Sequence, residues 1–173
     1  EKALHHYPYD HYDFWRAELG NIARLNEFGA FGENISTEGL TENNVAVGDR
    51  FRLGTALIEV SQGRQPCWKL NARFDVTDMS SRVQLTGRSG WYYRVLEEGS
   101  AEAGDAMILV ERLSPDWTLH RLWHLLYVDT LNYEKLGQMA IIPHLADGWK
   151  NYAIRRLKNR KVEDWASRLK GQD

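Results

Sequence analysis

The chain has 173 residues, a formal net charge of −2 at pH 7 and 43% hydrophobic residues. This length can bury the core of a domain, and this hydrophobic content is too high for a disordered chain. No apolar run reaches the length of a membrane-spanning helix, so we expect a soluble globular protein.

A single cysteine, Cys67, limits the redox chemistry that the chain can carry. One thiol cannot form an internal disulfide, and it cannot supply a Cys-x-x-Cys metal site or the thiolates of an iron–sulfur cluster. An unpaired thiol suits a reducing compartment and no secretory signal is visible, so we expect a cytoplasmic protein. The chain begins at Glu1 without an initiator methionine, and we expect that N-terminal sequence is missing.

The first 113 residues read mainly as β-structure after one short helix. Apolar residues at helical spacing in "YDHYDFWRAEL" predict a helix ended by Gly20. From about residue 34 to 110, apolar residues alternate with period two, and Gly-Asp pairs at 48–49 and 104–105 predict turns whose aspartates bond to the main chain. Between these strands, "TDMSSRVQLTG" predicts a short helix capped by Asp78. The pattern is typical of a β-meander or small barrel.

The pattern of apolar residues changes at Ser114, where capping residues and helical spacing predict three short helices up to residue 173. Short helices are marginal alone, so they must pack against the barrel, against one another or against a second copy of the chain, and a homodimer is plausible. Residues 150–173 carry eight Lys or Arg against three acids. Such a tail can bind nucleic acid or an acidic partner, but we favour a solvated helix face.

The segment around the cysteine, "SQGRQPCWKL", has two interpretations. A free cysteine usually fills space as a small, buried hydrophobe. Nearby cations favour the thiolate, which attacks electrophiles or binds metal, and Arg64 and Lys69 are such cations if the fold turns them toward Cys67.

Three stretches together identify a family: "FGENISTEGLTENNVAVGD", "SQGRQPCWKL" and "TGRSGWYYRV". In this order they resemble the MOSC family, named from the C-terminal domain of molybdenum cofactor sulfurase, and within it the bacterial YiiM-type branch. The resemblance covers nearly the whole chain. It implies a MOSC-type β-barrel, similar to the pyruvate kinase barrel, over residues 1–113, and a three-helix C-terminal extension over residues 114–173.

The resemblance also implies the molybdenum cofactor (molybdopterin) and a set of residues around it. Cys67 matches the cysteine that ligates molybdenum, and a soft thiolate suits a metal that already holds the two sulfurs of a pterin dithiolene. Arg64, Lys2 and Arg94 are the cations we expect at the phosphate of the cofactor. We expect Asn34, Ser61 and Gln62 to hydrogen-bond to the pterin, although each is also an ordinary turn or surface residue type.

The reaction implied by the resemblance is reduction of N-hydroxylated compounds, such as N-hydroxylated purine bases and hydroxylamines. The sequence has no iron–sulfur motif and no Gly-x-Gly-x-x-Gly fingerprint, so electrons must come from a separate flavoprotein or ferredoxin-like partner. His5 and His6 lie near the implied site, and either could relay protons because imidazole titrates near neutrality.

Three other functions stay open on the sequence alone. The chain can be a non-catalytic carrier of the cofactor or of sulfur that uses the same cysteine. It can be a metal-free enzyme with Cys67 as nucleophile, although the segment offers cations and no adjacent histidine to serve as the base. It can be a nucleic-acid-binding module that uses the basic tail, which we consider unlikely to be its role because a solvated face explains the same charges.

Overall fold

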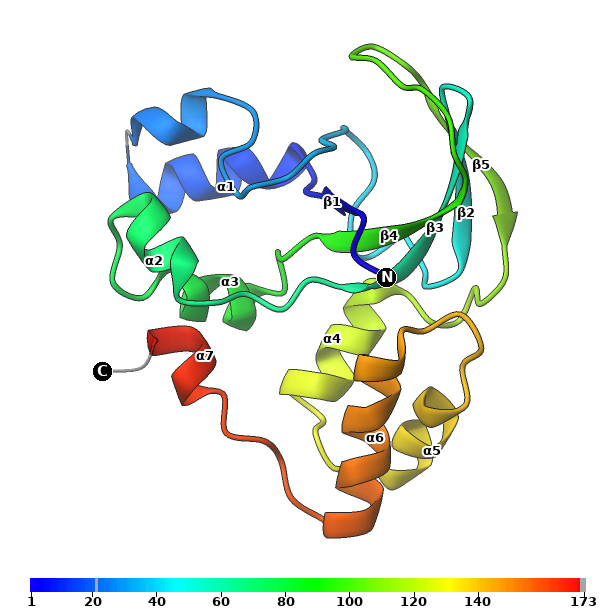
Figure 1. Ribbon diagram of the computed structural model, residues 1–173. Coiled ribbons are helices and arrows are strands. Elements are labelled where there is room, and N and C mark those ends of the chain that lie inside the picture. The colour runs from blue at the N-terminus through cyan, green and yellow to red at the C-terminus, as the bar shows by residue number, and fades with distance from the viewer. Residues whose placement is uncertain (21, 172–173) are drawn as a thin grey trace.

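The computed structural model describes residues 1–20 and 22–171, and its centre is one five-stranded antiparallel sheet. The strands lie in the order β1-β4-β3-β2-β5, and Figure 1 shows the sheet strongly curved. Their bounds are β1 Leu4–His6, β2 Asp49–Leu53, β3 Ala56–Gly63, β4 Trp91–Glu97 and β5 Met107–Arg112.

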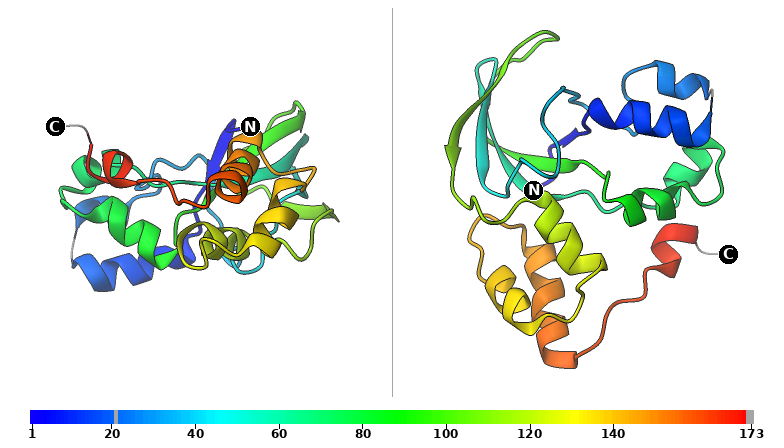
Figure 2. Two further views of the ribbon diagram at one scale, coloured as in Figure 1. Left: turned by 90° about the horizontal axis from the view of Figure 1, so that it is seen from below. Right: turned by 180° about the vertical axis from the view of Figure 1, so that it is seen from behind.

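Helices form two groups beside this sheet. The bounds before the C-terminal extension are α1 Asp10–Leu19, the 3-10 helix η1 Ala23–Asn26, α2 Lys69–Phe74 and α3 Met79–Thr86. The bounds within the extension are α4 Leu119–Tyr127, α5 Tyr133–Ala140, α6 Asp147–Asn159 and α7 Ala166–Lys170. Figures 1 and 2 show α4, α5 and α6 together at one end of the sheet, while α7 returns to the side of α2 and α3.

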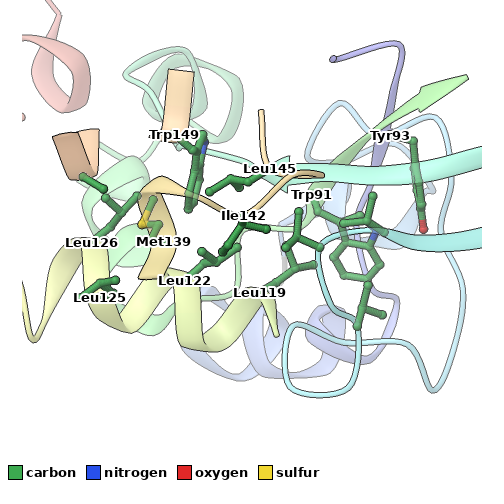
Figure 3. Close-up of a cluster of buried hydrophobic side chains, with 14 of the residues drawn as sticks. Trp91, Tyr93, Leu119, Leu122, Leu125, Leu126, Met139, Ile142, Leu145 and Trp149 are labelled. Carbon is green, nitrogen blue, oxygen red and sulfur yellow. The ribbon is translucent and has the colours of Figure 1, made fainter. Parts of the chain in front are cut away.

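The sheet and the extension share a hydrophobic core. Figure 3 shows Trp91 from β4 beside Leu119 of α4, with Met139 from α5 and Trp149 from α6 in the same cluster and Tyr93 at its edge. Burying each leucine of α4 contributes about 1.5–3 kcal/mol, which offsets the low stability of a nine-residue helix alone. The short helices therefore pack on the sheet and on one another.

A second core joins the other helices through aromatic side chains. The Tyr7 ring stacks on Phe31 with centroids 3.9 Å apart, and Trp15 and Phe74 lie around them. This cluster brings α1, α2 and α3 together. It places the segment after β3, which carries Cys67, between the sheet and a helical layer.

Most of the predicted local structure is confirmed. The helix ended by Gly20, the helix after Asp78 and both Gly-Asp turns are present. The Asp49 carboxylate accepts the Ala46 N–H at 2.9 Å, and Asp105 accepts the Glu102 N–H at 2.9 Å. Two capping predictions are wrong. The Asp78 side chain does not cap α3 and instead accepts Arg82 Nε at 2.9 Å. Thr118, and not Ser114 or Asp116, accepts the N–H of the first turn of α4, from Arg121 at 3.2 Å.

The global prediction is confirmed in outline, with two differences. The chain has a curved antiparallel sheet followed by a helical extension, but α1, α2 and α3 make the first part mixed α and β. Within the described residues β1 and β5 are edge strands that do not pair with each other. The described part of the extension, residues 114–171, contains four helices, because α7 follows the three that were predicted. No helix within residues 1–20 and 22–171 combines the length and apolar character needed to span a bilayer.

Candidate functional site

Cys67 lies in the turn that connects β3 to α2. Strand β3 ends at Gly63, and Pro66 has no N–H with which to continue the ladder, so the chain turns away from the sheet. The Cys67 side chain is half-buried and lines an open pocket of about 500 Å³, with Trp68 and Lys69 from the same turn and Ser167 and Arg168 from α7. The thiol is therefore reachable from outside.

Arg64 and His5 each have a buried side-chain nitrogen whose hydrogen-bonding capacity is unsatisfied among the described residues. The Arg64 N–H donates to the Gly90 carbonyl at 2.9 Å, which fixes the start of the turn. Arg64 Nη1 and His5 Nε2 are both buried and lack a hydrogen-bond partner in the part of the chain that the structure describes. A buried donor left in this state costs about 1–3 kcal/mol. Because the Arg64 guanidinium is cationic, these two unsatisfied nitrogens favour an anionic ligand.

Arg64 and Cys67 are close because only Gln65 and Pro66 lie between them in the chain. An extended chain spans about 3.5 Å per residue, so their Cα atoms are at most about 11 Å apart.

Lys2 and His5 both lie close to the ring of Tyr92. The Lys2 ammonium lies 5.9 Å from the centroid of the Tyr92 ring, and the His5 ring lies 5.2 Å from the same ring. Lys2 is exposed, so its charge is available to a ligand. Of the three predicted cations, Arg64 has a buried nitrogen without a partner among the described residues, and Lys2 lies over the same Tyr92 ring that contacts His5.

The third predicted cation, Arg94, lies in a different environment. Its guanidinium bonds to the buried Glu59 carboxylate at 2.7 Å, to the Glu1 carboxylate at 2.5 Å and to the His144 carbonyl at 2.9 Å. Two carboxylates already balance its charge. The structure therefore gives Arg94 a structural role in neutralising Glu59 and does not bring it to Arg64.

The three predicted polar residues also have internal partners. Asn34 Oδ1 accepts the His5 N–H at 2.9 Å and so holds β1 near the site. The Ser61 hydroxyl donates to the Tyr92 carbonyl at 3.1 Å, and Ser61 is fully buried. Gln62 is buried, and its Nε2 makes only a long contact of 3.4 Å with the Gly63 carbonyl. Asn34 and Ser61 thus support the strands that carry the site.

Glu42 and Gly90, which the sequence analysis missed, fix the position of the Arg64 backbone. The buried Glu42 accepts the Gly90 N–H at 2.7 Å, and its other carboxylate oxygen lies 2.6 Å from His11 Nε2. Gly90 in turn accepts the Arg64 N–H. A buried carboxylate therefore fixes the loop on which Arg64 rests, and a single glutamate in "GLTENNVAV" carries no sequence signal for this role.

The prediction that His5 and His6 titrate near neutrality is wrong. Burial, together with the nearby Arg64 charge, lowers the pKa of His5 to about 3. Burial likewise lowers the pKa of His6 to about 3, and His6 bonds to the Tyr93 hydroxyl at 2.9 Å. Both rings are neutral at neutral pH, so neither exchanges protons there as a relay requires.

These two histidines predict a loss of stability in acid. Between pH 6.5 and about 3 the unfolded chain binds protons that the folded chain does not, so stability is complete above pH 6.5 and falls as the pH drops. Each histidine contributes at most about 1.4 kcal/mol per pH unit in this window. Urea unfolding of the wild type and of His5→Gln at several pH values measures the slope. An equal slope in both proteins would contradict the assignment to His5.

Comparisons with known proteins identify the family of this chain. Residues 1–108 match the MOSC domain, and residues 117–160 match the YiiM-like, 3-alpha helix domain. The chain is 42% identical to protein YiiM of Escherichia coli over 99% of its own length and 76% of that protein. It is 37% identical to a protein named reductase from Gibberella moniliformis over 92% of its own length and 28% of that protein.

A solved structure extends the match to three dimensions. The crystal structure of YiiM from Escherichia coli superposes with a TM-score of 0.92 and 40% identity, covering 98% of this chain and 84% of that one. A domain match over more than half of the chain, close relatives and the superposed fold all point to one family. The chain therefore belongs to the MOSC domain family, and a YiiM-like three-helix domain follows its MOSC domain.

Proposed function

We propose that this protein is an oxidoreductase that binds the molybdenum cofactor through Cys67 and reduces N-hydroxylated compounds. The observation that carries the proposal is the reachable Cys67 thiol three residues after Arg64, whose buried Nη1 lacks a partner among the described residues. Membership of the MOSC family and the relative named reductase support this class of function. The same residues in a chain of unknown family would support only an anion site beside a thiol.

The residues present fit such a cofactor in part. A pterin phosphate is anionic, and the unsatisfied Arg64 Nη1 and the exposed Lys2 suit it. Cys67 offers the single soft ligand that the metal requires from the protein. Arg94 is already paired with two carboxylates, so we leave it out of the cofactor-binding set. Gln62 remains the best of the predicted pterin contacts, since its amide has only one long internal contact.

When bound, the molybdenum cofactor supplies two-electron chemistry, and the chain supplies binding, orientation and a fixed protonation environment. Arg64 would hold the phosphate, and Cys67 would supply the thiolate ligand to the metal. His5 stays neutral and can share a hydrogen bond through Nε2. Tyr7 keeps its proton, because burial and the Glu42 charge raise its pKa well above the ordinary value, and its hydroxyl donates to the Arg88 carbonyl at 3.0 Å.

The overall reaction consumes two electrons and two protons per N–OH group and yields an amine and water. The chain has one cysteine, so it cannot hold an iron–sulfur cluster to deliver the electrons. We propose a separate flavoprotein or ferredoxin-like donor, and a cytoplasmic location, where a single thiol stays reduced.

Turnover with a chemical electron donor tests the proposal. The protein, made anaerobically in a host that synthesises the cofactor, is mixed with reduced methyl viologen and an N-hydroxylated purine base. We expect dye oxidation matched by amine formation, and none in protein from a host that lacks the cofactor. Protein that contains molybdenum and pterin but gives no amine would instead favour the non-catalytic carrier.

A further inference from the structure

Helix α7 lies outside both matched regions, which end at residues 108 and 160, yet it contacts the turn that carries Cys67. The Arg168 side chain donates to the Pro66 carbonyl at 3.1 Å through Nε and to the Gln65 carbonyl at 2.9 Å through Nη2. The Arg168 carbonyl accepts the Trp68 N–H at 2.8 Å. One residue of α7 therefore bonds to the backbone on both sides of Cys67.

The same helix is fixed to the elements behind the turn. The Leu169 carbonyl accepts Asn71 Nδ2 from α2 at 3.0 Å and the Ser80 hydroxyl from α3 at 2.7 Å. Figures 1 and 2 show α7 beside α2 and α3, at the end of a long segment that leaves α6. Helix α7 is thus anchored independently of the turn that it holds.

A second set of contacts ties the turn to the rest of the extension. Gln65 Nε2 donates to the Tyr127 hydroxyl at 3.2 Å, and the Tyr152 hydroxyl donates to Gln65 Oε1 at 3.3 Å. Both tyrosine rings lie edge-on to Trp165, at 5.5 Å and 5.3 Å between centroids. Trp165 directly precedes α7, so these contacts set where α7 begins.

We propose that Arg168 is a positioning residue for Cys67 and that α7 acts as a strap that fixes the direction of the thiol. The inference rests on the proposed function and deepens it. A planar guanidinium that bonds to two successive carbonyls restrains both peptide planes before Cys67, and the Trp68 N–H bond restrains the one after it. Hydrogen bonds that hold a metal ligand in its binding orientation contribute to metal affinity, and the loss of one typically lowers that affinity tenfold to a hundredfold.

The first experiment measures the reactivity of Cys67 in cofactor-free protein. The whole chain is compared with Arg168→Ala, Arg168→Lys and a matched control, Lys170→Ala, which removes an exposed cation from the same helix. Because Cys67 is the only cysteine, iodoacetamide reports on it alone. The rate is followed from about pH 6 to about pH 10, so that the plateau, which reports access, is separated from the midpoint, which reports charge.

We expect the plateau rate to rise about fivefold or more in Arg168→Ala, partly in Arg168→Lys and not in Lys170→Ala. Hydrogen exchange should rise only around residues 64–71, which shows that the fold is intact. A plateau rate in Arg168→Ala equal to that of the wild type would overturn the proposal. Should Arg168→Ala fail to fold, Arg168→Lys, which keeps the charge but loses the planar fork, decides by the same criterion.

The second experiment measures molybdenum per chain in the same four proteins made anaerobically in a cofactor-competent host. We expect Arg168→Ala to retain about tenfold less than the wild type and Lys170→Ala to match it. Equal retention in Arg168→Ala would overturn the positioning role even if the thiol became more reactive. A wild type without molybdenum would contradict the proposed function, and the alkylation result would still decide whether Arg168 fixes the thiol.

Discussion

Replacing Gly90 by Ala is expected to lower the free energy of unfolding by about 3 kcal/mol or more. Gly90 has φ +71°, and a Cβ there would lie 2.2 Å from the His6 carbonyl oxygen and 3.1 Å from His5 Nε2. The first atom belongs to the backbone of β1 and cannot rotate away. The substitution must therefore displace β1 or the loop that ends at Gly90, which also carries the carbonyl that accepts the Arg64 N–H.

A matched control separates this steric clash from the cost of the backbone conformation. Gly104 also has a positive φ, +98°, but nothing lies within 4 Å of a Cβ built there. Gly104→Ala is expected to cost about 1–2 kcal/mol, from the left-handed conformation alone. Urea denaturation of both variants gives the comparison. An equal loss of unfolding free energy in Gly90→Ala and Gly104→Ala would mean that the close approach of Gly90 to β1 does not constrain the folded protein.

Replacing Cys67 is expected to abolish N-hydroxyl reduction, by about 100-fold or more, with little loss of stability. The thiol is half-buried and lies at a pocket, so Cys67→Ala removes few packing contacts and should change the free energy of unfolding by about 1 kcal/mol or less. Cys67→Ser keeps the size and offers a hard oxygen in place of the soft thiolate, so it should also be inactive.

The measurement is donor-coupled amine formation by the wild type and both variants at equal protein concentration. Denaturation curves of the three proteins serve as the control for folding. Activity of Cys67→Ser within about twofold of the wild type would show that the thiolate is not required, and it would return Cys67 to the role of a buried hydrophobe.

Local features of this fold could be predicted because short-range physics decides them. The spacing of aromatic residues before Gly20 gives α1, and each Gly-Asp pair makes its turn through a bond within three residues. The strands follow from period-two alternation for the same reason. The helical extension was also predicted, but the return of α7 was not, because a five-residue helix has almost no pattern of its own.

Whether the charge of a predicted site residue is left unbalanced by the fold could not be predicted from the sequence. Arg64 and Arg94 look alike in the sequence, yet Glu59 and Glu1, the latter 93 residues away, neutralise Arg94 while Arg64 keeps an unpartnered Nη1 among the described residues. Neither fact can be derived from neighbours along the chain.

The prediction that the basic tail, residues 150–173, is a solvated helix face is correct for only some of its cations. The prediction holds for exposed residues such as Lys158 and Lys161. It is wrong for Arg156, which is fully buried and forms an ion pair with Glu163 at 2.8 Å. It is also wrong for Arg168, which bonds to carbonyls 102 and 103 residues away. Long-range pairing decides which cations of a tail face solvent.

The proposal that Cys67 holds the molybdenum cofactor is tested by measuring molybdenum and pterin per chain, anaerobically, in protein from a cofactor-competent host and in its Cys67→Ala variant. We expect about one of each per chain in the wild type and loss of molybdenum in the variant, as a single thiolate ligand requires. Equal molybdenum in both proteins, or none in either, would contradict it.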